Sequence, residues 1–218
     1  MTLKVPGYTP KKRNSGTRKR QAIILISTEG KNQTETNYFN GFSNRKVHIY
    51  FAPGRFTDPV NMVKKLSGAM KNLGFDSKLG DKAFCLIDAD VSPSKNQEIA
   101  EADTIARQKG IDLIVSAPCF ELWFLCHYSF SLKQYGSNDE LIADLMKNKD
   151  FSDYKKNCIG LYDKLLPRLD KAINNAKRLE EELIKLGKTK HTVDFSPSTE
   201  AYHVVETIKQ IEKSNSES

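Results

Sequence analysis

The sequence lacks any long apolar run. No stretch of its 218 residues approaches the ~20 consecutive apolar side chains that a membrane-spanning helix needs. The first twenty residues are polar and basic, so no hydrophobic secretion signal is expected there. Both observations predict a cytoplasmic protein with no membrane segment.

Cysteines at metal-binding spacing are also missing. The chain has four cysteines, Cys85, Cys119, Cys126 and Cys158, each in apolar surroundings and without a C-x-x-C pair. This pattern favours buried free thiols in a reducing compartment over disulfides. No glycine-rich nucleotide loop of the Walker type occurs either, so we do not expect the chain itself to be an ATPase.

Acidic residues are absent from the first twenty positions, which contain seven lysines and arginines. The whole chain has 34 basic and 27 acidic residues, so this segment carries the entire net charge of +7. We interpret residues 1–20 as a flexible basic arm. Such an arm binds nucleic-acid phosphates by releasing counterions, or it simply keeps the protein soluble; the sequence leaves both options open.

What the chain does contain is a series of short, dense apolar runs. Residues 22–26 and 83–87 are continuously apolar, which is typical of strands buried on both faces. The β-rich segments 47–51 and 112–115 predict two further strands. Helical patterns separate these strands, so residues 21–130 predict an α/β domain with a mainly parallel sheet flanked by helices. The predicted helices cover residues 34–42, a segment that starts at Asp58-Pro59, residues 97–108 and residues 120–127.

Strand signals disappear after Ser131. We predict helices around residues 141–145, over 161–186 with a bend at Pro167, and from about Ser198 onward. Residues 131–218 are therefore interpreted as a C-terminal helical extension packed on the same domain.

Acidic residues stand where two of the predicted strands end. Glu29-Gly30 follows the first strand, and Asp88-Ala89-Asp90 ends the third. The carboxyl ends of parallel strands meet at one edge of a sheet, so these three carboxylates are expected to converge. Carboxylates that close together repel one another unless a cation lies among them, and Mg²⁺ (or Mn²⁺) is the natural ligand of such oxygens. The alternative is that they are ordinary solvated loop ends.

These motifs resemble the Toprim fold and, more closely, the RloB-like family of phage-defence proteins, which is related to the nuclease half of overcoming-lysogenization-defect (OLD) proteins. The most specific match is the segment Pro-Cys-Phe-Glu-Leu-Trp at residues 118–123. The other matching pieces are the ILI-x-x-EG-x-x-TE pattern at 24–35 (with one extra residue before Thr34), Asp58-Pro59, Ile87 to Asp90, 172–176 and 197–199.

The resemblance implies a Mg²⁺-dependent nuclease with Glu29, Asp88 and Asp90 as metal ligands. It also implies an ABC/AAA-type ATPase partner encoded nearby, a nucleic-acid substrate for which tRNA is the expected class, and a role as effector of abortive infection. Family members often carry a further acidic residue just after Asp-x-Asp, where this chain has Val91.

Five further residues are candidates for the same site. Glu35 lies near a second acidic position of OLD-type nucleases, and Glu121 lies in an apolar context where an unpaired carboxylate is costly. Lys31, Lys155 and Lys156 are candidate contacts to substrate phosphate. Each has a structural alternative, as a helix-terminal acid, a buried partner or a surface lysine.

Two other functions are compatible with the same residues. One is a non-catalytic Toprim-like subunit that regulates its ATPase or binds nucleic acid. The other is a primase-type or phosphotransferase enzyme that uses the same carboxylates on nucleotides. The sequence does not indicate the oligomeric state.

Overall fold

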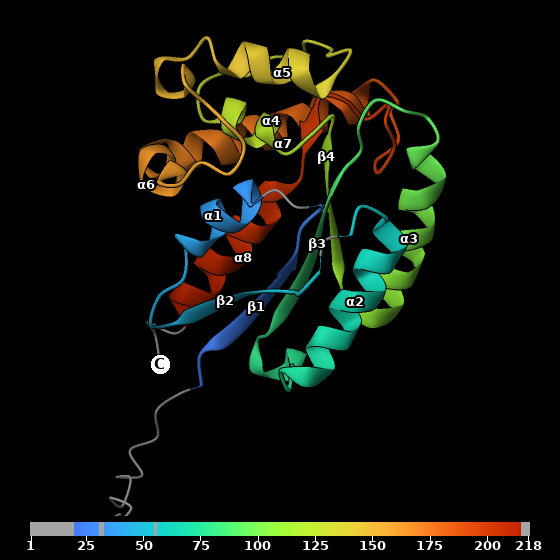
Figure 1. The fold of residues 1–218 in the computed structure, drawn as a ribbon, viewed down its shortest axis with the longest axis vertical. Coiled ribbons are helices and arrows are strands. Elements are labelled where there is room, and N and C mark those ends of the chain that lie inside the picture. The colour runs from blue at the N-terminus through green and yellow to red at the C-terminus, as the bar shows by residue number, and fades with distance from the viewer. Residues whose placement is uncertain (1–19, 31–32, 55, 215–218) are drawn as a thin grey trace, which may run out of the picture.

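A computed structural model of the chain describes residues 20–30, 33–54 and 56–214. All of the predicted basic arm except Arg20 lies outside the described residues, and so does Lys31. The described chain is an α/β protein built on one five-stranded sheet in the order β2-β1-β3-β4-β5 (Figure 1). Strands β1 (Ala22–Ser27), β2 (Val47–Phe51), β3 (Lys82–Asp88) and β4 (Asp112–Ala117) run parallel, and β5 (Ser198–Thr199) runs antiparallel to β4. The fold class predicted from the sequence is confirmed.

The central strands are apolar throughout because helices cover both faces of the sheet. Leu25, Cys85 and Val115 point to a core formed with α2 (Pro59–Asn72) and α3 (Lys95–Lys109). Ile24, Phe84 and Ile114, their neighbours along each strand, point to the opposite face. That face is covered by α1 (Thr34–Asn40) and α8 (Ala201–Ser214), and α7 (Leu169–Lys185) extends the same core by packing against α8 and β5. Alternate residues of one strand therefore serve two cores, as the pleat of a strand requires.

The residues that the sequence indicated as helix starts and stops begin and end helices in the structure. Asp58 caps α2 by accepting a hydrogen bond of 2.7 Å from the backbone N–H of Asn61, and Pro59 occupies the first helical position. Gly110 ends α3 in the left-handed conformation.

Two predictions for the C-terminal part need correction. The prediction that no strand follows Ser131 is wrong at β5, whose Thr199 hydroxyl lies 2.8 Å from that of Ser116 on β4. A two-residue strand is too short to show a periodic pattern, and only its pairing with β4 defines it. The predicted helix over 161–186 is interrupted rather than merely bent: α6 (Leu161–Leu165), the 3₁₀ turn η3 (Leu166–Arg168) and α7 follow one another. Pro167 lacks the N–H that a continuous helix requires.

Three short helices lie beyond the carboxyl ends of the strands (Figure 1). They are α4 (Glu121–Cys126), α5 (Asn138–Leu145) and α6, and single 3₁₀ turns occur at η1 (Ser77–Leu79) and η2 (Lys149–Phe151). Trp123 on α4 and His127 just after it are fully buried. Trp123 belongs to the core that this layer shares with the sheet, and the ring of His127 packs against Trp123. The four cysteines are free thiols, as predicted. In the part of the chain that the structure describes, no helix has both the length and the apolar character needed to cross a bilayer.

Candidate carboxylate site

Five carboxylates line one cavity of about 200 Å³ at the carboxyl end of the sheet. They are Glu29, Glu35, Asp88, Asp90 and Glu121, and the other lining residues are Gly30, Thr34, Thr57, Asn138 and Lys156. Larger cavities exist elsewhere on the described surface, so it is the lining and not the size that distinguishes this one. The structure thus brings together all five acidic residues that the sequence analysis selected.

Glu29 connects the ends of two neighbouring strands. It lies two residues beyond β1, and its Oε2 accepts a hydrogen bond of 3.3 Å from the backbone N–H of Asp88, the last residue of β3. Gly30 follows with φ +71° and donates its N–H to the carbonyl of Phe56 at 2.7 Å. Glycine adopts this left-handed conformation at little energetic cost, so the chain can turn immediately after Glu29.

The Asp-x-Asp segment is held in an unusual conformation. Asp90 has φ +54°, which is uncommon for a residue with a side chain, and its N–H donates to the carbonyl of Pro118 at 2.9 Å. The Oδ1 of Asp88 accepts a hydrogen bond of 2.9 Å from the backbone N–H of Phe120. The Oδ1 of Asp90 accepts one of 2.9 Å from the amide of Asn138 on α5. Such conformations persist where the surroundings enforce them, commonly at functional sites.

Glu35 and Glu121 form the inner part of the cavity. Their side chains come from the first turns of α1 and α4, and the two residues are only 7% and 3% exposed. Glu121 accepts a hydrogen bond of 2.9 Å from the hydroxyl of Tyr154. The Oε2 of Glu35 has no hydrogen-bond partner among the described residues, and neither has the Oδ1 of Asn138. Two buried oxygen atoms with unused acceptor capacity therefore line the same cavity.

Two lysines contact different carboxylates of the site. The Nζ of Lys156 lies 4.0 Å from Glu121, and its loop is fixed to α1 because the N–H of Asn157 donates to the hydroxyl of Thr34 at 3.1 Å. The Nζ of Lys95, in the first turn of α3, lies 3.2 Å from Glu29 and 3.7 Å from Asp90. Lys155 is exposed and does not line the cavity.

The sequence analysis missed Lys95, Asn138 and Tyr154. For Lys95 a signal was available, because it follows Asp90 by only five residues and precedes the predicted helix 97–108 by two. Asn138 and Tyr154 come from the C-terminal extension, and nothing in their local sequence relates them to the strands.

Burial makes negative charge costly in this cavity. It raises the pKa of Glu29, an effect that Lys95 opposes, and it raises the pKa of Glu35 to about 7, with Glu121 adding to the rise. The pKa of Asp88 lies well above its ordinary value, because the side chain is buried and four other carboxylates surround it. Burial by itself lowers the pKa values of Lys95 and Lys156. The neighbouring carboxylates, Glu29 for Lys95 and Glu121 for Lys156, help to outweigh this effect, so the pKa of each lysine is raised. The cavity therefore favours any added positive charge.

This donor set fits a hard divalent cation such as Mg²⁺ or Mn²⁺. The lining supplies carboxylate and amide oxygens, no sulfur and no imidazole, and two of those oxygens lack partners. Lys95 pairs with Glu29, and the backbone N–H of Phe120 binds Asp88, so these carboxylates are fixed in position.

A different group of side chains has its possible metal-ligand atoms close together. Among the described residues, one ligand atom from each of three side chains lies within 4.8 Å of the others at Glu180, Glu200 and His203. At that cluster the Nζ of Lys190 already lies 2.7 Å from Glu180 and 3.4 Å from Glu200, and supplies the compensating charge.

The fold and the site define a class: an α/β protein with a mainly parallel sheet and an acidic cavity at the carboxyl ends of its strands. Within that class, the family model described as RloB-like protein matches residues 24–208, which include all five carboxylates and Lys156. The chain therefore belongs to the RloB-like family, as the sequence motifs predicted. No curated protein and no solved structure matches it.

Proposed function

We propose that this protein is a metal-dependent nuclease that hydrolyses phosphodiester bonds in RNA, with tRNA as its substrate class. The observation that carries the proposal is the cavity itself, which lies at the carboxyl edge of a mainly parallel sheet. Five carboxylates from four segments of the chain line it, and the Oε2 of Glu35 and the Oδ1 of Asn138 have no hydrogen-bond partner among the described residues. Such edges are where α/β proteins bind ligands. The mainly parallel sheet is consistent with the Toprim-like fold that the resemblance implies.

Each lining residue has a role that its surroundings support. Glu29, Asp88 and Asp90 hold the cation, which supplies activation of a water molecule and neutralisation of charge at the phosphate. Lys156, next to Glu121 at the cavity wall, contacts a non-bridging phosphate oxygen. Glu35, whose pKa of about 7 lies near neutral pH, accepts or donates a proton.

The biological setting is proposed from the family resemblance. The nuclease would be the effector of an abortive-infection system and would be controlled by an ABC/AAA-type ATPase partner. Family membership supports this setting, and the mapping of the site onto Glu29, Asp88 and Asp90 agrees with it.

One observation favours the alternative of a non-catalytic regulatory subunit. Lys95 bridges Glu29 and Asp90, so a protein cation already occupies one side of the proposed metal position. In a catalytic site Lys95 has to move aside or to contact the substrate, and Lys95→Met should then change Mg²⁺ affinity or activity. In a regulatory subunit Lys95 is a permanent structural partner, and Lys95→Met should lower stability without affecting any metal dependence.

The test is cleavage by the full chain, alone and with its ATPase. Labelled tRNA, total RNA and DNA are incubated with Mg²⁺, Mn²⁺ or EDTA, and the products are separated on denaturing gels. We expect discrete RNA fragments that require the divalent cation and are lost in Asp88→Asn and Glu29→Gln. Asp112→Asn is the matched control, because this exposed aspartate starts β4 at the opposite end of the same sheet. Equal cleavage by Asp88→Asn and wild type, or no cleavage by any form with the partner present, contradicts the proposal.

A further inference from the structure

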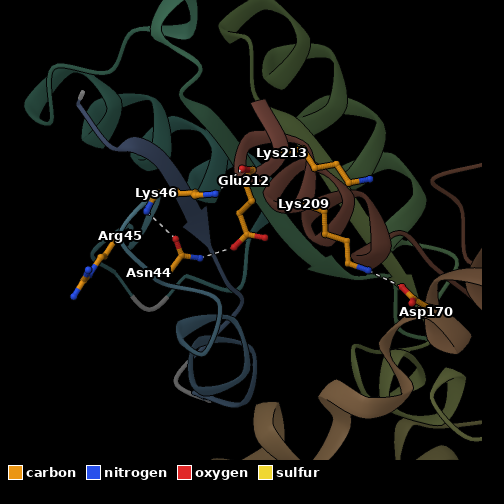
Figure 2. Close-up of a pocket in the computed structure, with 7 residues that line it drawn as sticks. All are labelled: Asn44, Arg45, Lys46, Asp170, Lys209, Glu212 and Lys213. Carbon is orange, nitrogen blue, oxygen red and sulfur yellow. Dashed lines mark hydrogen bonds and ion pairs between the residues drawn. The ribbon is translucent and has the colours of Figure 1, made fainter. Parts of the chain in front are cut away.

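A second cavity, of about 780 Å³, lies at the other end of the sheet (Figure 2). It is bordered by the segment that leads into β2 and by the last turns of α8, whereas the carboxylate site lies where β1 and β3 end. We call it the basic groove. Its lining contains four cationic side chains and two carboxylates: Arg45, Lys46, Lys209, Lys213, Asp170 and Glu212, together with Asn44.

Both carboxylates of the groove are engaged by the protein. Asp170 lies 2.6 Å from the Nζ of Lys209, and Glu212 accepts a hydrogen bond from the amide of Asn44 (Figure 2). Figure 2 shows the side chains of Arg45 and Lys213 extending away from these pairs on the two sides of the groove. The lining therefore has a formal surplus of two positive charges, spread over its width.

The basic groove continues along the surface between α7 and α8. An adjoining cavity of about 400 Å³ shares Asp170, Lys209 and Lys213 with it and adds Lys177, whose Nζ lies 2.6 Å from Glu206 of the same lining. The positive side chains thus form a series along an extended surface rather than one enclosed pocket. An extended series of cations suits a polyanion better than a single phosphate.

The basic N-terminal segment is attached at this same end of the sheet. Ala22 of β1 is paired with Val47 of β2, and the side chain of Gln21 donates a hydrogen bond of 2.9 Å to the carbonyl of Asn44, a residue of the groove. The chain before Arg20 contains six more lysines and arginines and no acidic residue. Gln21 therefore places the start of the described chain beside the basic groove.

We propose that the basic groove binds the sugar-phosphate backbone of RNA, independently of sequence and of divalent metal. A six-residue strand spans about 20 Å, so the groove and the carboxylate site, at opposite ends of the sheet, are separated by a distance of that order. Binding of this kind depends on counterion release and weakens steeply with salt. It does not require that the carboxylate site be catalytic.

The experiment measures binding of the full chain to a fluorescein-labelled single-stranded RNA by anisotropy, in EDTA and over a series of salt concentrations. The groove variant is Arg45→Gln/Lys209→Gln/Lys213→Gln. Its control is Lys64→Gln/Lys71→Gln/Lys109→Gln, which removes the same charge from exposed positions on α2 and α3. We expect the groove variant to bind at least about tenfold more weakly and its salt slope to fall by about 2, with little change in the control.

A second variant, Lys11→Gln/Lys12→Gln/Arg13→Gln, tests the competing explanation that these basic residues, which lie outside the described residues, bind the RNA instead of the groove. It should bind RNA like the Lys64→Gln/Lys71→Gln/Lys109→Gln control. Asp88→Asn should bind RNA like wild type even though it abolishes cleavage, which separates this proposal from the nuclease proposal. Equal affinity of the groove variant and the control for RNA overturns the assignment of the groove to RNA. An acidic protein partner is then the alternative occupant. A loss in the N-terminal variant alone overturns it as well.

Discussion

Glu35 is the residue whose replacement tests the electrostatics of the cavity most directly. Its pKa is raised from 4.5 to about 7, chiefly by burial, and its Oε2 has no hydrogen-bond partner in the part of the chain that the structure describes. Because the folded state holds this proton more tightly than the unfolded state, the group favours folding fully below about pH 4.5. That contribution is lost as the pH rises to about 7. At about 1.4 kcal/mol per pH unit, the ionised Glu35 destabilises the metal-free fold by about 3 kcal/mol at pH 8.

Glu35→Gln keeps the size of the side chain and removes the titration. Without metal, we expect the variant to differ little from wild type at pH 5 and to be more stable by about 2 to 3 kcal/mol at pH 8. Added Mg²⁺ should reverse this order at pH 8, because a cation in the cavity stabilises the ionised wild type more than the amide.

The assay is urea unfolding at pH 5, 6.5 and 8, in EDTA and in Mg²⁺. Glu181→Gln, an exposed position on α7, is the control for the loss of one carboxylate. Parallel pH profiles for wild type and Glu35→Gln would refute the reasoning, since Glu35 would then be ionised in the fold without cost.

Three further predictions concern stability. Burial lowers the pKa of His127 to about 4, so the contribution of this residue to folding is complete above about pH 6.5 and is lost as the pH falls. Wild type should therefore lose about 2 kcal/mol of unfolding free energy between pH 7.5 and pH 5 that His127→Gln does not lose, as measured by urea unfolding. Asp81 accepts hydrogen bonds from Arg20 and from the backbone N–H of Ile23, each at 2.8 Å. Asp81→Ala should therefore lower the unfolding free energy by about 2 to 3 kcal/mol, measured by denaturant titration. Asp58→Ala removes the cap of α2 and should cost about 1 kcal/mol in the same assay; an unchanged midpoint for either variant would contradict its assigned role.

Much of the fold was predictable because its strands are buried on both faces. A strand with helices on both sides must be apolar at every position, so β1 and β3 are visible as unbroken runs. The break in the C-terminal helix was partly predictable, since Pro167 is marked in the sequence. Strand β5 was not, because two residues carry no pattern and only the free edge of β4 gives them a partner.

The candidate site divides in the same way. Glu29, Asp88 and Asp90 could be grouped from the sequence, because parallel strands place their carboxyl ends at one edge. Lys156 was selected as one of several lysines, and only the structure shows that it lines the cavity while Lys155 does not. The assignment of these residues to catalysis stays a prediction.

The sequence by itself determined the class of fold, the family and the edge at which the acidic residues collect. Those properties follow from local pattern: apolar runs make strands, and the residues that end each run lie at the end of a strand. The tertiary structure decided what surrounds each carboxylate. Lys95, Asn138 and Tyr154 reach the cavity from α3, α5 and a distant loop, and their contacts depend on packing between segments far apart in the chain. The same holds for the basic groove, since the start of β2 and the end of α8 meet only in the folded protein.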